Sequence, residues 1–108
     1  MDSQIFSSFI KDNHLFDKTK ENLMLCLNHF YKTEQERFHE MFQADLDQVI
    51  NTYVFENEGV SFSKSFSYDP PLDYISVWIR IYDREKDYLA EYTAFYDLEL
   101  NQIDDRLK

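Results

Sequence analysis

Apolar residues in the first half of the chain recur at steps of three and four, the spacing of one face of a helix. The positions that follow this spacing are Leu23, Cys26, Leu27, Phe30, Tyr31, Phe38, Met41, Phe42, Leu46, Val49 and Ile50. The stripe is interrupted near Glu34, where Thr33 and Glu36 have the spacing of a capping box, so we favour two helices over one long helix. Residues 3–10 predict a further short helix, and Asp17 is a suitable N-cap for the helix after it.

The second half alternates apolar and polar residues, the period of a strand with one buried face. Serines alternate with the apolar residues Val60, Phe62, Phe66 and Tyr68. Residues 69–71 (Asp-Pro-Pro) end this strand, and a second one follows in which Ile75, Val77, Ile79 and Ile81 alternate with polar and aromatic residues. Upstream, Thr52 to Phe55 is β-branched and aromatic, and the turn sequence at residues 56–59 predicts a hairpin in which Gly59 takes positive φ.

Residues 88–107 fit both periods. A strand would bury Tyr88, Ala90, Tyr92, Ala94, Tyr96, Leu98 and Leu100 on one side, whereas a helix would bury Tyr88, Tyr92, Phe95, Tyr96, Leu100, Ile103 and Leu107. We favour a strand to about residue 100 because the segment is β-branched and aromatic, and because the sheet would otherwise be very small. A short helical tail after Asn101 is compatible with the remaining residues.

Cross-strand matching supports this strand. If Arg84 to Asp87 form a four-residue loop, large residues face small ones on an unbroken apolar side and Tyr82 faces Leu89. The apolar pairs of this register are Ile81 with Ala90, Ile79 with Tyr92, Val77 with Ala94 and Ile75 with Tyr96. On the opposite side it pairs Arg80 with Glu91, Trp78 with Thr93, Ser76 with Phe95 and Tyr74 with Asp97. A one-residue slip would bury Glu91 among aliphatic residues, so the sequence disfavours it.

These elements predict an α+β fold in which two or three N-terminal helices pack on one face of a three- to four-stranded antiparallel β-meander. The length of 108 residues corresponds to a single domain. We expect residues 1–55 to be mainly helical, residues 52–100 to form the sheet, and residues 101–108 to form a tail.

Charge is distributed unevenly along this fold. Residues 34–108 contain 17 of the 21 acidic residues and 7 of the 11 basic ones, which accounts for the whole net charge of −10. The run from Asp87 to Asp105 contains six acids and no lysine or arginine. Such a skew predicts a basic partner and disfavours direct binding of nucleic acid, whose phosphates the chain would repel.

The predicted register gathers a candidate binding face on the side of the sheet away from the helices. We expect its partner-binding residues to be Tyr74, Trp78, Arg80, Glu91, Phe95, Asp97 and Glu99. Aromatic residues and arginine are enriched at interaction hot spots, and Glu91, Asp97 and Glu99 would form a row of outward carboxylates along the strand. Burial beneath a further helix and homodimerisation are alternative uses of the same face.

Other chemistry finds little support in the sequence. His39 and Glu40 begin an HExxH zinc motif, but Gln43 stands where the second histidine belongs, so we expect no metal and no cofactor. Cys26 cannot form an internal disulfide, and its apolar surroundings predict an unreactive buried thiol. No basic leader or apolar run of membrane-spanning length is present, which favours a cytoplasmic protein.

We therefore expect a binding protein rather than an enzyme: a small acidic inhibitor that neutralises a basic protein by stoichiometric binding. An immunity protein or antitoxin against a nuclease-type toxin fits this expectation best. The first alternative is a phage-encoded nucleic-acid mimic that inhibits a CRISPR or restriction enzyme. The second is an enzyme or ligand carrier with a pocket on a curved sheet, as in NTF2-like domains, although no motif of the chain matches that family.

Overall fold

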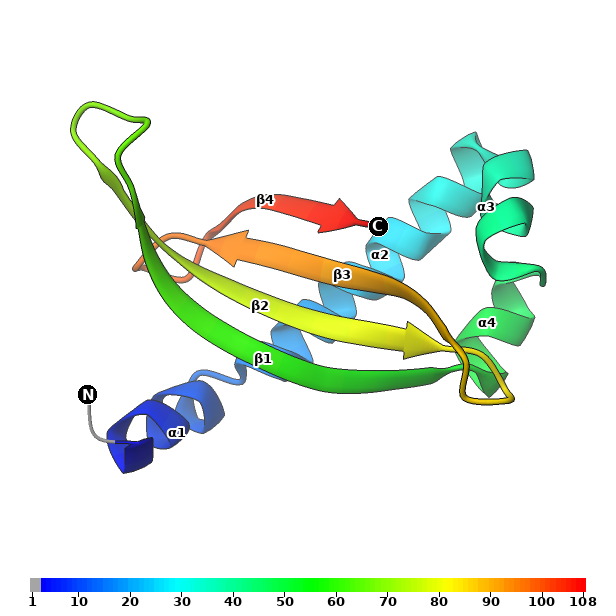
Figure 1. The fold of residues 1–108 in the computed structure, drawn as a ribbon, viewed down its shortest axis with the longest axis horizontal. Coiled ribbons are helices and arrows are strands. Elements are labelled where there is room, and N and C mark those ends of the chain that lie inside the picture. Colours follow the sequence, from blue (N-terminus) through cyan, green and yellow to red (C-terminus); the bar gives the residue numbers. More distant parts are fainter. Residues whose placement is uncertain (1–2) are drawn as a thin grey trace.

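In the computed structural model, which describes residues 3–108, a layer of helices lies behind an open four-stranded sheet (Figure 1). The helices are α1 (Ser3–Asp12), α2 (Leu15–Thr33), α3 (Gln35–Phe42) and α4 (Leu46–Thr52). The strands are β1 (Val54–Ser65), β2 (Leu72–Tyr82), β3 (Tyr88–Tyr96) and β4 (Gln102–Leu107). The strands pair antiparallel in the order β1-β2-β3-β4. The predicted α+β fold with an antiparallel meander is confirmed.

The predicted break near Glu34 is confirmed, but the predicted caps are wrong. Thr33 is the last residue of α2, and its hydroxyl donates to the carbonyl of His29 at 2.8 Å instead of capping α3. The helix α2 starts at Leu15, two residues before Asp17, which lies in its first turn. The capping box of the chain lies instead at the start of α4, where Asp45 caps the helix and its backbone N–H donates to the Gln48 side chain at 3.3 Å.

The predicted hairpin at residues 56–59 is wrong, because β1 runs through this segment as one strand. Its register against β2 shifts between Asn57 and Gly59, so the extra residue Glu58 forms an irregularity in the strand and not a turn. The glycine has no positive φ. At the other end β1 stops at Ser65, which leaves Phe66 79% exposed in the loop before β2.

The predicted pairing of β2 with β3 is confirmed from Ile75–Tyr96 through Ile81–Ala90. The last pair differs: Tyr82 lies opposite Tyr88 and not Leu89, because the register shifts after Ile81. The prediction that the strand continues to about residue 100 is also wrong. It ends at Tyr96, and the Asp97 carboxylate accepts the backbone N–H groups of Glu99 and Asn101 at 2.9 Å, which turns the chain.

Residues 102–107 form the edge strand β4 and not a helical tail. The turn after Tyr96 reverses the chain beside β3, and β4 pairs with it from Tyr92–Leu107 to Tyr96–Gln102. Leu100 takes a φ of 68° in this turn. Of the apolar residues whose spacing fitted a helix here, Leu100 and Leu107 pack against the core as parts of a turn and a strand, whereas Ile103 is 45% exposed.

The core fills the space between α2 and the sheet. From Ile75 to Ile81 and from Ala90 to Tyr96 every second residue is fully buried there, against apolar residues of the helices. The buried sheet residues are Ile75, Val77, Ile79, Ile81, Ala90, Tyr92, Ala94 and Tyr96, and the helix residues are Leu15, Leu23, Leu27, Phe38, Phe42 and Val49. The residues between these core positions consequently point to the opposite face of the sheet.

Two tyrosines on this buried face reach polar partners. The hydroxyl of Tyr96 lies 2.8 Å from the Thr19 hydroxyl and accepts the Asn22 side-chain N–H at 3.2 Å, both on α2. Tyr92 donates to Asp105 of β4 at 2.7 Å. Since a buried polar group without a partner is costly, these bonds fix the position of α2 and β4 relative to β3.

We predict that Tyr96→Phe destabilises the fold by about 1–2 kcal/mol, because it leaves the buried Thr19 hydroxyl and the partly buried Asn22 amide with one partner fewer. Urea unfolding monitored by circular dichroism measures the change. Tyr88→Phe is the matched control, since Tyr88 is 56% exposed, and its unfolding free energy should change by less than about 0.5 kcal/mol. Equal effects of the two substitutions would contradict the assignment.

Candidate partner-binding face

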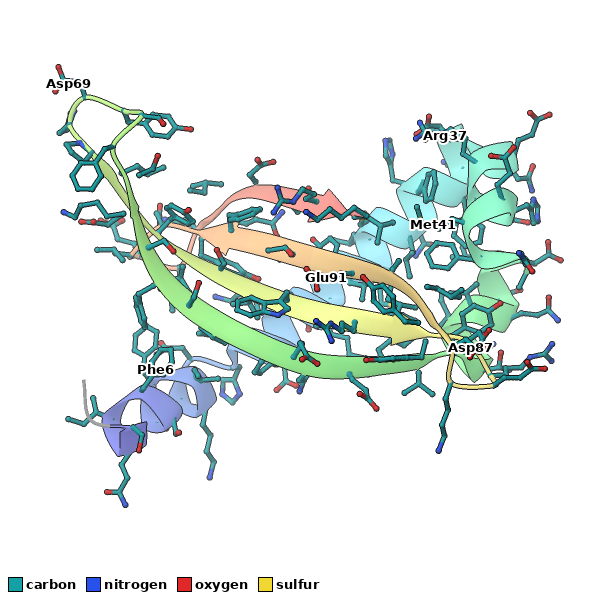
Figure 2. All side chains as sticks on the ribbon, viewed as in Figure 1. Phe6, Arg37, Met41, Asp69, Asp87 and Glu91 are labelled. Atoms are coloured by element: carbon teal, nitrogen blue, oxygen red, sulfur yellow. The ribbon has the colours of Figure 1, made fainter. Side chains whose placement is uncertain are left out.

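The face of the sheet away from the helices, which we call the outer face, brings together five of the predicted site residues. Tyr74, Trp78 and Arg80 come from β2, and Glu91 and Phe95 come from β3. They alternate with the buried core residues, so the pleat turns them to the opposite side. Within the described residues 3–108 the helices lie on the other side of the sheet (Figure 1), and side chains rather than a further element cover this one (Figure 2).

Trp78 lies flat across the neighbouring strand β1. It is paired with Gly59, and a Cβ atom built on that glycine would stand only 2.3 Å from the Cζ2 atom of the indole. The single glycine of the chain therefore serves close approach and not a turn. The result is a broad, partly exposed aromatic surface in the middle of the outer face.

The outer face is hollowed where Tyr74 and Phe95 meet β4. Tyr74 and Phe95 place their ring centroids 6.0 Å apart at 60°, and the guanidinium of Arg106 lies 5.4 Å above the Phe95 ring. With Tyr68 and Leu72 they line a cavity of about 300 Å³. The sequence pointed to Tyr74 and Phe95 but missed Arg106, because the β4 strand that brings it here was not predicted.

Arg80 is held between two carboxylates. Its side chain lies 3.5 Å from Glu58 of β1 and 3.5 Å from Glu91 of β3, and its guanidinium lies 5.8 Å from the centroid of the Tyr88 ring. A hydrogen bond with Tyr82 and then the charge of Glu58 raise the pKa of Arg80, so it stays cationic. Glu91 is consequently paired with Arg80. Glu58 is paired with the same guanidinium, although the hairpin prediction had placed it in a turn.

The predicted row of outward carboxylates from Glu91 to Glu99 is wrong. The strand ends before Asp97, so Asp97 and Glu99 lie in the β3–β4 turn at the border of the sheet. The backbone N–H of Asn101, assisted by the Asn101 side chain and the N–H of Glu99, lowers the pKa of Asp97 against a smaller opposing effect of burial. Asp97 thus stabilises the turn, and of the three predicted carboxylates Glu91, Asp97 and Glu99 only Glu99 is exposed.

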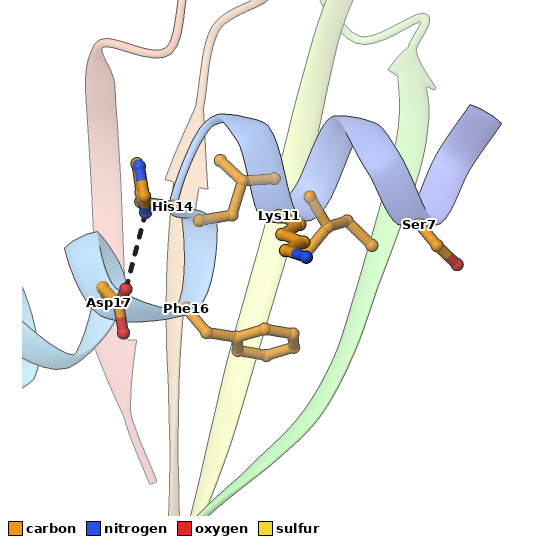
Figure 3. A pocket seen from close by; sticks show the side chains of 7 residues that line it. Ser7, Lys11, His14, Phe16 and Asp17 are labelled. Atoms are coloured by element: carbon orange, nitrogen blue, oxygen red, sulfur yellow. Dashed lines mark ion pairs between the residues drawn. The ribbon is translucent and has the colours of Figure 1, made fainter. Parts of the chain in front are cut away.

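The hollow between α1 and α2 offers no comparable arrangement. It has a volume of about 520 Å³ and an apolar side formed by Ile10, Leu15 and Phe16. Figure 3 shows Lys11, His14 and Asp17 at its border, with His14 and Asp17 3.7 Å apart. The side chains of this ion pair are 75% and 85% exposed, which is typical of a solvated surface contact.

Two further features bear on reactive chemistry. Cys26 is only half-buried, and burial, with a smaller contribution from Asp105, raises the pKa of its thiol to about 11. The thiol is therefore protonated at neutral pH, in keeping with the predicted low reactivity. Within residues 3–108 no three His, Cys, Asp or Glu side chains are grouped so that they could hold a metal ion, and no helix has the length and apolar character needed to cross a membrane.

No protein family model, curated protein or solved structure matches this chain.

We predict that Gly59→Ala displaces Trp78, because the added methyl group would overlap the indole. The expected cost is about 1–3 kcal/mol of unfolding free energy, as for other overpacked sites. Fluorescence reports the displacement directly, since Trp78 is the only tryptophan, and its emission should shift to longer wavelength as the ring becomes hydrated. Ser61→Ala, on the same face of β1, is the control and should leave the spectrum unchanged. An unshifted Gly59→Ala spectrum would show that the indole does not lie on the glycine.

We predict that Asp97→Asn lowers stability at neutral pH and that this difference disappears in acid. The folded protein holds the Asp97 pKa below the ordinary value of 3.8, so the carboxylate contributes stability above that pH and loses it as the pH falls through the folded pKa. Denaturant midpoints of wild type and variant across this range measure the effect. Glu99→Gln in the same turn should show no such pH dependence, since only the backbone of Glu99 takes part in the turn. A wild-type advantage that persists in strong acid would refute the role of Asp97.

Proposed function

We propose that the protein is a small acidic inhibitor that neutralises a basic protein by stoichiometric binding through the outer face, in the manner of an immunity protein or antitoxin against a nuclease-type toxin. The observation that carries this proposal is the aromatic surface of Tyr74, Trp78 and Phe95 on the uncovered side of the sheet. An aromatic centre surrounded by charged residues has the composition of an interface whose affinity comes from a few desolvated anchors.

The carboxylates that could attract a basic partner lie at the border of this face and not at its centre. At the centre Arg80 is paired with both Glu58 and Glu91, so covering this group buries paired charges with a remaining net charge of −1. At the border Glu56, Glu99 and Asp104 are exposed and take part in no ion pair among the described residues. Such carboxylates accelerate the approach of a basic protein and fix its orientation.

This arrangement favours an inhibitor with aromatic anchors over a nucleic-acid mimic. A mimic requires regularly spaced, unpaired carboxylates that replace phosphates, whereas Glu91 is paired and Asp97 is engaged in a turn. It also gives less support to the pocket enzyme or carrier. The helix-facing side of the sheet, where such a pocket would lie, is filled by fully buried residues such as Ile79, Tyr92 and Tyr96.

The test begins with affinity purification from the native host, followed by measurement of the affinity of the captured protein. We predict that Trp78→Ala weakens binding at least about 30-fold, the loss of about 2 kcal/mol expected of a hot-spot residue. Phe66→Ala is the matched control, because Phe66 is a more exposed aromatic residue in the loop beyond β1 and should not affect affinity. Affinity should also fall as salt rises, since added ions screen the border carboxylates.

The enzymatic readout then separates the alternatives. A nuclease-type partner should lose its activity when one equivalent of this protein is added. Nucleic acid that is already bound to the nuclease should not prevent this inhibition. A mimic would instead compete with DNA or RNA. Equal affinities of Trp78→Ala and wild type, or a captured partner whose activity is unaffected, would refute the proposed function.

A further inference from the structure

A second surface of the molecule lies at the free edge of the sheet, where the helix layer extends beyond β4. A groove of about 510 Å³ runs between this strand and the helices α2 and α3. Its apolar lining includes Leu25, which is 68% exposed, together with Cys26, Phe30 and Met41. Figure 2 marks Arg37 and Met41 at the α3 end of this region. The helices thus present apolar side chains where the sheet has no strand to cover them.

The backbone of β4 points toward the same space. Glu91 and Lys108 exchange both of their backbone hydrogen bonds, at 2.7 and 3.0 Å. Because bonded and non-bonded pairs alternate in an antiparallel ladder, the N–H and C=O groups of Asp105 and Leu107 point away from β3. The side chains of these two residues also line the groove. A free ladder edge and an apolar groove therefore adjoin each other.

We propose that β4 accepts an extended, basic segment of a partner protein as a fifth strand. Backbone bonds to Leu107 and Asp105 would hold the segment, and its alternate side chains would enter the groove on Leu25 and Phe30. This site shares Asp104 with the border of the outer face but none of its aromatic residues. It adds a strand-addition surface to the proposed function.

Charge selects a basic segment over a second copy of this chain. Asp104 and Asp105 are exposed carboxylates without an ion-pair partner among the described residues, and Asp104 accepts the edge N–H of Asp105 at 2.8 Å. In the free protein this contact covers one donor of the edge, a common protection against self-pairing. A second copy would carry the same net charge of −10 and be repelled, whereas a lysine or arginine of a basic segment would draw Asp104 away from the donor and neutralise it.

The opposite edge of the sheet lacks this combination. On β1 the register shift at Glu58 disturbs the ladder. Farther along the strand, Phe6 and Phe9 of α1 pack on Phe62 at ring-centroid distances of 5.2 and 5.6 Å. Figure 2 shows Phe6 between α1 and this strand. The β4 edge is therefore the better candidate for strand addition.

The probe is a blocked seven-residue peptide that alternates lysine with valine, added to the full-length ¹⁵N-labelled protein. We predict that saturating peptide slows amide exchange of Leu107 at least about tenfold and leaves Arg106, whose N–H already faces β3, much less affected. The same peptide with N-methylated central residues should not bind, because it lacks backbone donors. Leu25→Glu and Asp104→Asn should each weaken binding at least about threefold, whereas Glu40→Gln, on the exposed surface of α3, should have no effect.

Three results would overturn this proposal. The first is absence of binding at millimolar peptide. The second is binding that shifts the Trp78 indole signal without protecting Leu107, which would place the peptide on the outer face. The third is protection of Leu107 that rises with protein concentration in the absence of peptide, which would identify a second copy as the occupant. None of them tests Trp78 in the complex with the native partner, so the two proposals can fail independently.

Discussion

The pairing of Ile79 with Tyr92 is the contact on which the rest of the structure depends, because it fixes which face of β2 and β3 meets the helices. In this register the alternating aliphatic residues from Ile75 to Ile81 turn toward the helices, and Trp78, Arg80 and Glu91 turn outward together. A slip by one residue would exchange the two faces of one strand and bury the charge of Glu91 beside Ile79. The hydrophobic core and the aromatic outer face are therefore two consequences of a single register.

The parts of the fold that could be predicted from the sequence are those where one pattern decides the outcome. Large residues opposite small ones, such as Val77 opposite Ala94, allow only one register of β2 with β3. The parts that were predicted wrongly depend on local alternatives of similar energy. Glu58 and Gly59 fit a turn as well as a bulge, and only the space required by Trp78 shows why the glycine is there. At the end of β3 the Asp97 side chain accepts backbone N–H groups and so ends the strand. A pattern of apolar residues contains no information about such a hydrogen bond.

The same limits apply to the candidate site. Tyr74, Trp78, Arg80, Glu91 and Phe95 could be placed on one face because their positions follow from the β2–β3 register. Asp97 and Glu99 could not, because they lie beyond the point where that register ends. The exposed carboxylates Glu56, Glu99 and Asp104 consequently lie at the border of the outer face, while at its centre, beside the aromatic residues, Arg80 is paired with Glu58 and Glu91. A basic partner would be attracted by the border and held by the centre.

Hydroxyl-radical footprinting of the complex with the native partner tests the central claim most directly, since it reports the exposure of individual side chains. The account predicts that oxidation of Tyr74, Trp78 and Phe95 falls strongly when the partner binds. Oxidation of Ile5 on α1, which is 65% exposed and distant from the outer face in sequence and fold, should remain unchanged. Unchanged oxidation of Trp78 in a saturated complex would show that the partner binds elsewhere and would contradict the account.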